Sequence, residues 1–245
     1  MPHNPDPITY ASGQFPSTHW SLIIRAGSPG SPQAHAALAE LCSVYWYPIY
    51  AFIRRKGNGH DQALDLTQGF FARLLERGIL AAAAPGKGRF RAFLRTDCQH
   101  FLIDQFRRMT ARGGGISSVS IDAQRAKDRY RFEPVDTLTP DRLFDRAWAL
   151  TLLEKVLDLL GAEYAAKGQS ELFDHLKIVL TQGKGAVPAA TLAAQLGKTE
   201  EAVHMAIHRL RKRYREILEA QIAATLDDPS EMEDEIRSLF EAITS

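Results

Sequence analysis

Apolar residues recur three or four positions apart along most of the chain, which is the spacing of helices that bury one face. The helices that this spacing predicts cover residues 33–55, 60–77, 90–109, 140–160, 171–181 and 231–243, with a pair of helices between 187 and 215. No segment of the sequence stands out with the period of two that a half-buried strand requires. The pattern therefore predicts an all-α fold.

Residues 110–139 break the periodicity, and a stretch of this length is more than one compact domain usually accommodates. We therefore expect two helical domains joined by a flexible linker, the C-terminal one containing a helix-turn-helix. The segments are an irregular N-terminal segment (1–33), a first helical domain (34–110), the linker (111–139), a second helical domain (140–225) and an acidic helical extension (226–245).

The pair of helices between 187 and 215 has suitable residues at its ends. Pro188 fits the first position of a helix, where its missing N–H costs nothing. Gly197 can adopt the left-handed conformation that ends a helix, and Thr199 is suited to cap the start of the next one. Two helices separated by such a turn have the helix-turn-helix pattern.

The outward positions of the second of these helices are His204, Met205, His208, Arg209, Arg211, Lys212 and Arg213. They begin as hydrogen-bonding side chains and end as cations, which suits a helix that reads base edges with its N-terminal half and holds phosphates beyond it. We interpret this stretch as DNA-binding. The alternative is an ordinary amphipathic helix with a solvated basic face.

The formal net charge of +1 over 245 residues hides a strong polarity along the chain. Residues 86–112 carry seven basic and two acidic residues, and residues 199–215 carry five basic and two acidic ones. Residues 227–245, in contrast, carry seven acidic residues and one basic one. Two basic segments far apart in sequence suggest two contacts with a polyanion, and the acidic tail suggests a competitor for them.

That acidic tail allows two interpretations. Its predicted helix could fold back on a basic DNA-binding surface, or it could extend the packing of the second helical domain. Packing is favoured, because Ile236, Leu239 and Phe240 need burial.

The sequence favours the cytoplasm. It contains no apolar run long enough to span a membrane, and residues 1–20 lack the basic start and apolar core of a secretion signal. Cys42 and Cys98 are two isolated thiols, which suit a reducing compartment, although the sequence alone leaves a disulfide open.

No constellation of residues indicates catalysis, a metal site or a cofactor. Lys87 lies between two glycines but lacks the spacing and the following Ser or Thr of a P-loop. His204 and His208 share a helix face, yet no Glu lies between them in the zinc-protease pattern and no third ligand is evident. We therefore expect a protein that is not an enzyme.

Four segments form a pattern through their order and spacing: LCSVYWYPIYAFIRR, LDLTQGFFARLLE, GRFRAFLRTDCQHFLIDQFRR and the helix pair. In this pattern the chain resembles bacterial RNA polymerase sigma factors. The resemblance is to the extracytoplasmic-function type of the sigma-70 family, and it covers residues 38–108 and 148–218. It implies a factor that binds core RNA polymerase at the clamp helices of the largest subunit and at the flap. Such a factor recognises the minus-thirty-five and minus-ten elements of promoter DNA and promotes melting. The alternative is a stand-alone helix-turn-helix regulator that binds duplex operator DNA.

The resemblance also implies roles by position. The residues expected to bind polymerase are Asp61, Asp65, Gln68 and Phe71. Those expected at the minus-ten element are Lys87, Arg89, Phe90, Arg91, Arg95, His100, Arg107 and Arg108. Those expected at the minus-thirty-five element are Thr199, His204, His208, Arg209, Arg211 and Lys212.

One departure from the family concerns the clamp-binding helix, which usually carries several carboxylates. Here only Asp65 keeps its charge, Asp61 is a partial substitute, and Gly69 costs the helix about 1 kcal/mol relative to Ala. Some members of the family are regulated by Ser/Thr kinases, and Thr67 lies in this patch that has lost its carboxylates. A phosphate on Thr67 would restore negative charge, so Thr67 is a candidate phosphorylation site. Control by an anti-sigma factor or by a kinase remains open at this stage.

Overall fold

The computed structural model of the protein describes residues 32–76, 89–112, 123–131, 137–182, 187–226 and 228–244. All regular structure within these ranges is helical, which confirms the all-α prediction. None of the helices in these ranges is long and apolar enough to cross a membrane. Lys87 and most of the predicted irregular N-terminal segment (1–33) lie outside the described residues.

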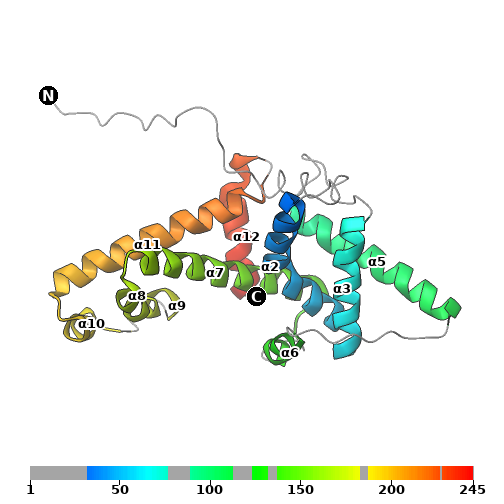
Figure 1. Cartoon of the computed structure of the whole chain (residues 1–245), viewed down its shortest axis with the longest axis horizontal. Helices are drawn as coiled ribbons and strands as arrows, with labels where there is room; N and C mark the ends of the chain where they lie inside the picture. Colours follow the sequence, from blue (N-terminus) through cyan, green and yellow to red (C-terminus); the bar gives the residue numbers. More distant parts are fainter. Residues whose placement is uncertain are drawn as a thin grey trace.

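The elements follow one another in the order shown in Figure 1. They are α2 (Pro32–Arg55), α3 (His60–Glu76), α5 (Phe90–Arg112), α6 (Ala123–Arg131), α7 (Pro140–Ala166), α8 (Ser170–Leu176), α9 (Ile178–Thr181), α10 (Ala189–Leu196), α11 (Glu200–Ala223), the 3₁₀ turn η1 (Pro229–Glu231) and α12 (Met232–Thr244). The helix predicted over 171–181 is divided at Lys177 into α8 and α9.

Helix α7 begins where its sequence predicts. The hydroxyl of Thr139 accepts a hydrogen bond from the backbone N–H of Arg142, and Pro140 occupies the first turn. The helix continues past the predicted end at residue 160 as far as Ala166. Gly168 then takes a φ of +66°, the left-handed conformation that ends helices.

The centre of the molecule is the contact between α2 and α7, the most extensive between any two described helices. Phe52 and Phe144 meet edge to face with ring centroids 6.3 Å apart. Tyr45 on α2 and Trp148 on α7 are fully buried members of the same hydrophobic core. The two predicted groups of helices therefore share one apolar interface.

Helix α6 lies within the stretch that was predicted to be a flexible linker. Its Arg129 guanidinium lies 3.9 Å from the ring centroid of Tyr47 on α2 and donates to Thr151 and Glu154 on α7. A cation over an aromatic ring combined with hydrogen bonds gives this short polar helix specific partners. The periodicity of the sequence missed α6 because few of its residues are apolar.

Helix α12 crosses α7, packs against it and also contacts α11 (Figure 1). Leu239 is fully buried, and Ile236, Ala242 and Ile243 are half-buried against the core. The Arg146 guanidinium on α7 donates to the backbone carbonyl of Ile243. The acidic extension therefore packs on the C-terminal helices, although Phe240 is exposed. Its Glu235 also pairs with Arg89 and Arg91 of the basic segment 86–112, so the two interpretations of the extension do not exclude each other.

Candidate nucleic-acid interfaces

Helices α10 and α11 are joined by a three-residue turn, residues 197–199. Gly197 adopts φ 60° and ψ 35°, and the Thr199 hydroxyl accepts from the Ala202 N–H at 3.2 Å. Both features agree with the prediction from sequence. Pro188, predicted at the first helical position, instead occupies the N-cap position, and Ala189 is the first residue of α10. Thr199 therefore has a structural role as the cap of α11, whatever else it contacts.

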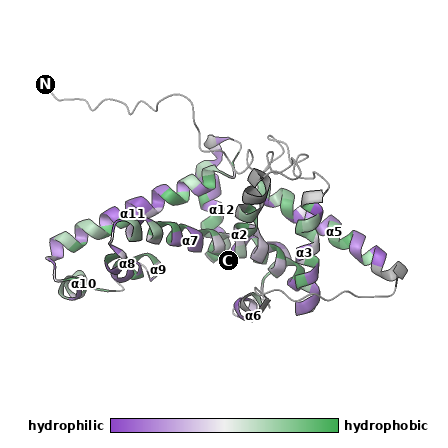
Figure 2. Ribbon diagram, in the orientation of Figure 1, coloured by the Kyte–Doolittle hydropathy of each residue, from purple (hydrophilic) through white to green (hydrophobic). Residues whose placement is uncertain are grey.

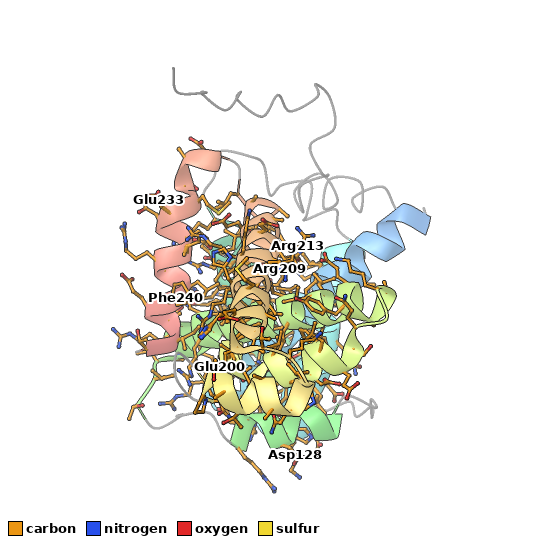
Figure 3. The ribbon with its side chains drawn as sticks, turned by 90° about the vertical axis from the view of Figure 1, so that its left-hand side faces the viewer. Asp128, Glu200, Arg209, Arg213, Glu233 and Phe240 are labelled. Atoms are coloured by element: carbon orange, nitrogen blue, oxygen red, sulfur yellow. The ribbon has the colours of Figure 1, made fainter. Side chains whose placement is uncertain are left out.

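Helix α11 buries Val203 and Leu210 and leaves a polar and cationic face uncovered. The exposed residues on that face include His204, Met205, His208, Arg209 and Lys212, while Arg211 is half-buried. Hydrophilic and hydrophobic residues alternate along this helix in Figure 2, and Figure 3 shows Arg209 and Arg213 along it. The predicted duplex-facing residues are therefore available on one helix.

The cationic run ends in ion pairs. Arg213 donates to both carboxylate oxygens of Glu163 at 2.7 and 2.9 Å, and these hydrogen bonds lower the pKa of Glu163. Arg215 similarly pairs with Glu219 at 2.7 Å. Within the described residues, the cations of α11 that form no ion pair are Arg209, Arg211 and Lys212, all before Arg213.

The N-terminal end of α5 differs from the expectation that its arginines face DNA. The Oε2 atom of Glu235 on α12 lies 3.0 Å from Arg89 Nε and 3.2 Å from Arg91 Nη2. Arg89 also donates to the Ser238 hydroxyl at 2.8 Å. The structure thus brings two predicted minus-ten residues onto the acidic C-terminal helix, a contact between segments far apart in sequence.

Arg91 is buried beneath this contact. Its guanidinium lies 4.5 Å from the ring centroid of Trp148, and Asp145 Oδ1 lies 3.9 Å from its Nε. Glu235 is only 2% exposed, and burial raises its pKa although Arg91 and Arg89 act in the opposite direction. Glu235 Oε2 is within ion-pair distance of both arginines without the alignment of a hydrogen bond.

Arg95, one turn further along α5, is held by two carboxylates of α7. Its Nε lies 3.1 Å from Asp141 Oδ1, and its Nη1 donates to Asp145 Oδ2 at 2.9 Å. Arg89, just before α5, and Arg91 and Arg95 in its first turns are therefore all engaged by the C-terminal half of the chain.

Phe90, expected at the minus-ten element, is buried instead. Its ring is 1% exposed and meets Tyr45 edge to face at 5.4 Å, with Phe93 stacked on its other side at 6.1 Å. A base cannot stack on a ring that is enclosed in this way, so Phe90 is a core residue in this conformation.

The C-terminal half of α5 is the exposed part of this helix. His100, Arg107 and Arg108 are exposed as expected, and the apolar Phe106 is also 70% exposed. The buried positions Leu94, Cys98 and Phe101 recur at intervals of four and three, and this series continues through polar residues. Phe106 lies off that stripe, and this was the sequence signal that could have identified it as exposed.

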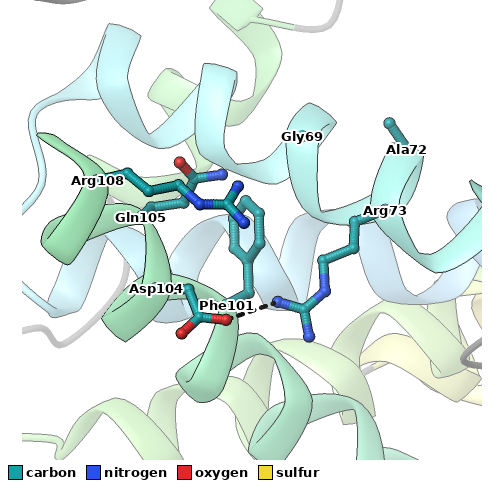
Figure 4. Close-up of a pocket in the computed structure, with 7 residues that line it drawn as sticks. All are labelled: Gly69, Ala72, Arg73, Phe101, Asp104, Gln105 and Arg108. Atoms are coloured by element: carbon teal, nitrogen blue, oxygen red, sulfur yellow. Dashed lines mark ion pairs between the residues drawn. The ribbon is translucent and has the colours of Figure 1, made fainter. Parts of the chain in front are cut away.

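A groove beside Phe106 separates α3 from α5 and has a volume of about 510 Å³. It is lined by Lys56, Asn58, Gln62, Leu66, Gln99, Leu102, Ile103, Gln105, Phe106 and Arg107. A second cavity of about 180 Å³ between the same helices contains Arg108 and Gly69 (Figure 4). There Arg73 lies over the Phe101 ring and within 3.8 Å of Asp104.

The predicted polymerase-binding residues of α3 do not form one exposed face. Asp61 is exposed and Asp65 and Gln68 are half-buried, but Phe71 is buried. Thr67, the candidate phosphorylation site, is 0% exposed, and its hydroxyl donates to the Ala63 carbonyl at 2.6 Å. In this conformation a kinase cannot reach Thr67, and Phe71 cannot contact a partner.

The chain matches no protein-family model, no curated protein and no solved structure. Cys42 and Cys98 are both free thiols. Across the described ranges, His, Cys, Asp and Glu side chains do not gather in a group of three that could hold a metal ion.

Proposed function

We propose that the chain is a sigma-type initiation factor, which directs core RNA polymerase to promoter DNA through two separate contacts. The observation that carries this proposal is the α10–α11 pair, which presents polar and then cationic side chains beside a capped three-residue turn. We interpret it as a helix-turn-helix in which α11 enters the major groove at the minus-thirty-five element. His204 and His208 would contact base edges, and Arg209, Arg211 and Lys212 would contact bases or phosphates.

The second contact in the proposal is α5, at the minus-ten element. Its exposed half offers His100, Arg107 and Arg108 next to an exposed aromatic ring, Phe106. Cations that follow the backbone and an aromatic face that stacks on a base are what a single strand needs. In Figure 1, α5 and α11 lie on opposite sides of α2, which supports two separate contacts with nucleic acid.

The polymerase contact is proposed for α3, with the exposed Asp61 and the half-buried Asp65 and Gln68 meeting the clamp. Core polymerase and promoter DNA are thus the proposed partners, and the cytoplasm is the proposed location. The chain itself makes or breaks no bond in this scheme.

A second candidate is a stand-alone helix-turn-helix regulator that binds duplex operator DNA. The burial of Phe71 and Thr67 favours it, because it reduces the surface that α3 offers to a clamp. The two candidates share α11 and differ in whether polymerase is bound.

The experiment that separates them is retention of the full chain on immobilised core polymerase, followed by run-off transcription from a random promoter library. A sigma factor is retained and produces transcripts; a stand-alone regulator binds duplex DNA without either result. Failure to assemble with polymerase or to direct transcription would overturn the proposal.

Within that experiment, Lys212→Ala tests the role of α11. We expect weaker duplex binding, with a salt slope reduced by about one phosphate contact. Lys177→Ala is the matched control, because Lys177 is also an exposed lysine but lies between α8 and α9 and pairs with Asp174. Equal affinities for the two variants would remove α11 from the DNA-binding surface.

A further inference from the structure

The contact between α12 and the start of α5 joins the acidic C-terminal extension to two proposed DNA-binding arginines. Glu235 Oε2 lies between Arg89 and Arg91, at 3.0 and 3.2 Å, and Ser238 accepts a further hydrogen bond from Arg89. Leu239, one turn beyond Glu235, anchors the same helix in the core. Helix α12 therefore contacts the arginines through an acidic residue and the hydrophobic core through an apolar one.

The surroundings of this contact are rich in arginine. A cavity of about 390 Å³ between α5, α7 and α12 is lined by Arg89, Arg91, Ala92, Arg95, Arg142, Asp145, Ser238, Glu241 and Ala242. Guanidinium groups bind carboxylates and phosphates with the same planar set of N–H donors. Arg89 and Arg91, which lie within ion-pair distance of Glu235, and the arginine N–H groups that donate to Ser238 and Asp145 are not available to a nucleic-acid phosphate at the same time.

We propose that α12 is an intramolecular competitor of nucleic acid: docked, it occupies Arg89 and Arg91, and nucleic acid gains these arginines only when α12 leaves. This inference rests on the proposed function, since that function assigns the two arginines to the minus-ten strand. Competition follows from shared occupancy of the donors and requires no net attraction between Glu235 and the arginines.

The construction of α12 is compatible with release. It is a helix of 13 residues, and it is exposed at Glu233, Asp234 and Phe240, of which Glu233 and Phe240 are labelled in Figure 3. Its main contacts are with α7 and α11, and it also meets Arg89 and Arg91, so its departure would leave the α2–α7 interface in place. Its departure would also open Arg91, which α12 and Trp148 now enclose.

The first test uses the unmodified full chain and hydrogen exchange. A single-stranded oligodeoxynucleotide is added, and exchange of the backbone amides of α12 is compared with that of α8. Competition predicts faster exchange in α12 and no change in α8. If the oligonucleotide binds and α12 exchange is unchanged or slower, α12 does not compete.

The second test compares Glu235→Lys with Glu233→Lys on the same helix. The two substitutions change the net charge equally, but only Glu235 is buried beside arginines, whereas Glu233 is exposed. If the docked state outnumbers the released state about nine to one, releasing α12 raises the apparent affinity for the oligonucleotide about tenfold. We expect that gain, measured by fluorescence anisotropy, for Glu235→Lys beyond any gain for Glu233→Lys.

Two controls keep this second test decisive. Exchange protection of α2 and α7 shows whether Glu235→Lys remains folded outside α12. Glu235→Gln keeps the shape and an acceptor oxygen, so it should leave α12 docked and the affinity close to that of the unmodified chain. Equal affinities for folded Glu235→Lys and Glu233→Lys would overturn the competition.

The outcomes also separate this inference from the proposed function. If Arg89→Ala weakens oligonucleotide binding in every background while Glu235→Lys has no effect, the function stands and the competition is wrong. If no variant binds oligonucleotide and none is retained by polymerase, both are wrong.

Discussion

Thr67 offers the sharpest test of the described packing, because its buried position conflicts with a role as a phosphorylation site. The side chain is 0% exposed, and its hydroxyl donates to the Ala63 carbonyl one turn earlier in α3. Phe70 and Leu74 on the same helix are also fully buried. Replacing Thr67 by glutamate would place a negative charge among apolar side chains, and phosphorylation of Thr67 would do the same.

The expected loss of stability follows from this environment. A buried charge without a partner costs about 3–5 kcal/mol, a large part of the ~5–15 kcal/mol that stabilises a typical domain. Thr67→Val has a different consequence, because valine has a similar volume and the Ala63 carbonyl keeps its helical bond from the residue-67 N–H. Losing only the hydroxyl bond should cost about 0.5–1.5 kcal/mol.

Denaturant unfolding followed by circular dichroism measures both losses. Thr191→Glu is the matched control, since Thr191 is exposed on α10 and the substitution should change the unfolding free energy little. We expect Thr67→Glu to be far less stable than Thr67→Val, or unfolded at room temperature. A loss below about 1 kcal/mol for Thr67→Glu would contradict the burial of Thr67 and reopen α3 to kinases.

Three further results are expected. Gly161→Ala should lower the unfolding free energy by about 1–3 kcal/mol, because the new Cβ would lie 2.9 Å from Phe173 Cε1. Gly69→Ala, whose new Cβ would have its nearest contact at 3.5 Å, should instead raise the unfolding free energy by about 0.5–1 kcal/mol. Thr199→Ala should cost about 1 kcal/mol and speed hydrogen exchange in the first turn of α11, because the cap is lost. Burial raises the pKa of Glu235, so the docked helix binds that proton more tightly than a released one. Protection of α12 should therefore rise as the pH falls from neutrality toward the ordinary glutamate value of 4.5, and Glu235→Gln should lack this dependence.

The parts of the structure that could be predicted from sequence are those fixed by local chemistry. Thr139 and Thr199 cap helices because their hydroxyls reach N–H groups three residues later, and Gly197 ends a helix because it tolerates positive φ. These rules involve neighbours along the chain, so α7, α10 and α11 begin within one residue of the positions expected.

The candidate site was predicted less well, because its geometry depends on contacts that the sequence does not encode locally. Arg91 looks like any arginine on a basic helix, yet Trp148 and Glu235, both distant in sequence, enclose it. Thr67 and Phe71 lie in the segment that the resemblance assigns to polymerase docking, but both are buried where α3 packs on α2 and α5. Charge and periodicity identify helices and faces; they do not identify which distant element covers a face.

The pairing of α5 with α7 and α12 explains how a nearly neutral chain can contain two cationic surfaces. The arginines at the start of α5 are matched by Asp141, Asp145 and Glu235, whereas Arg107 and Arg108 remain exposed further along. Net charge therefore gives little information on affinity for nucleic acid, because part of the cationic surface is covered from within. If α5 binds a strand as proposed, its exposed end would meet that strand first, and contact with the covered end would require α12 to leave.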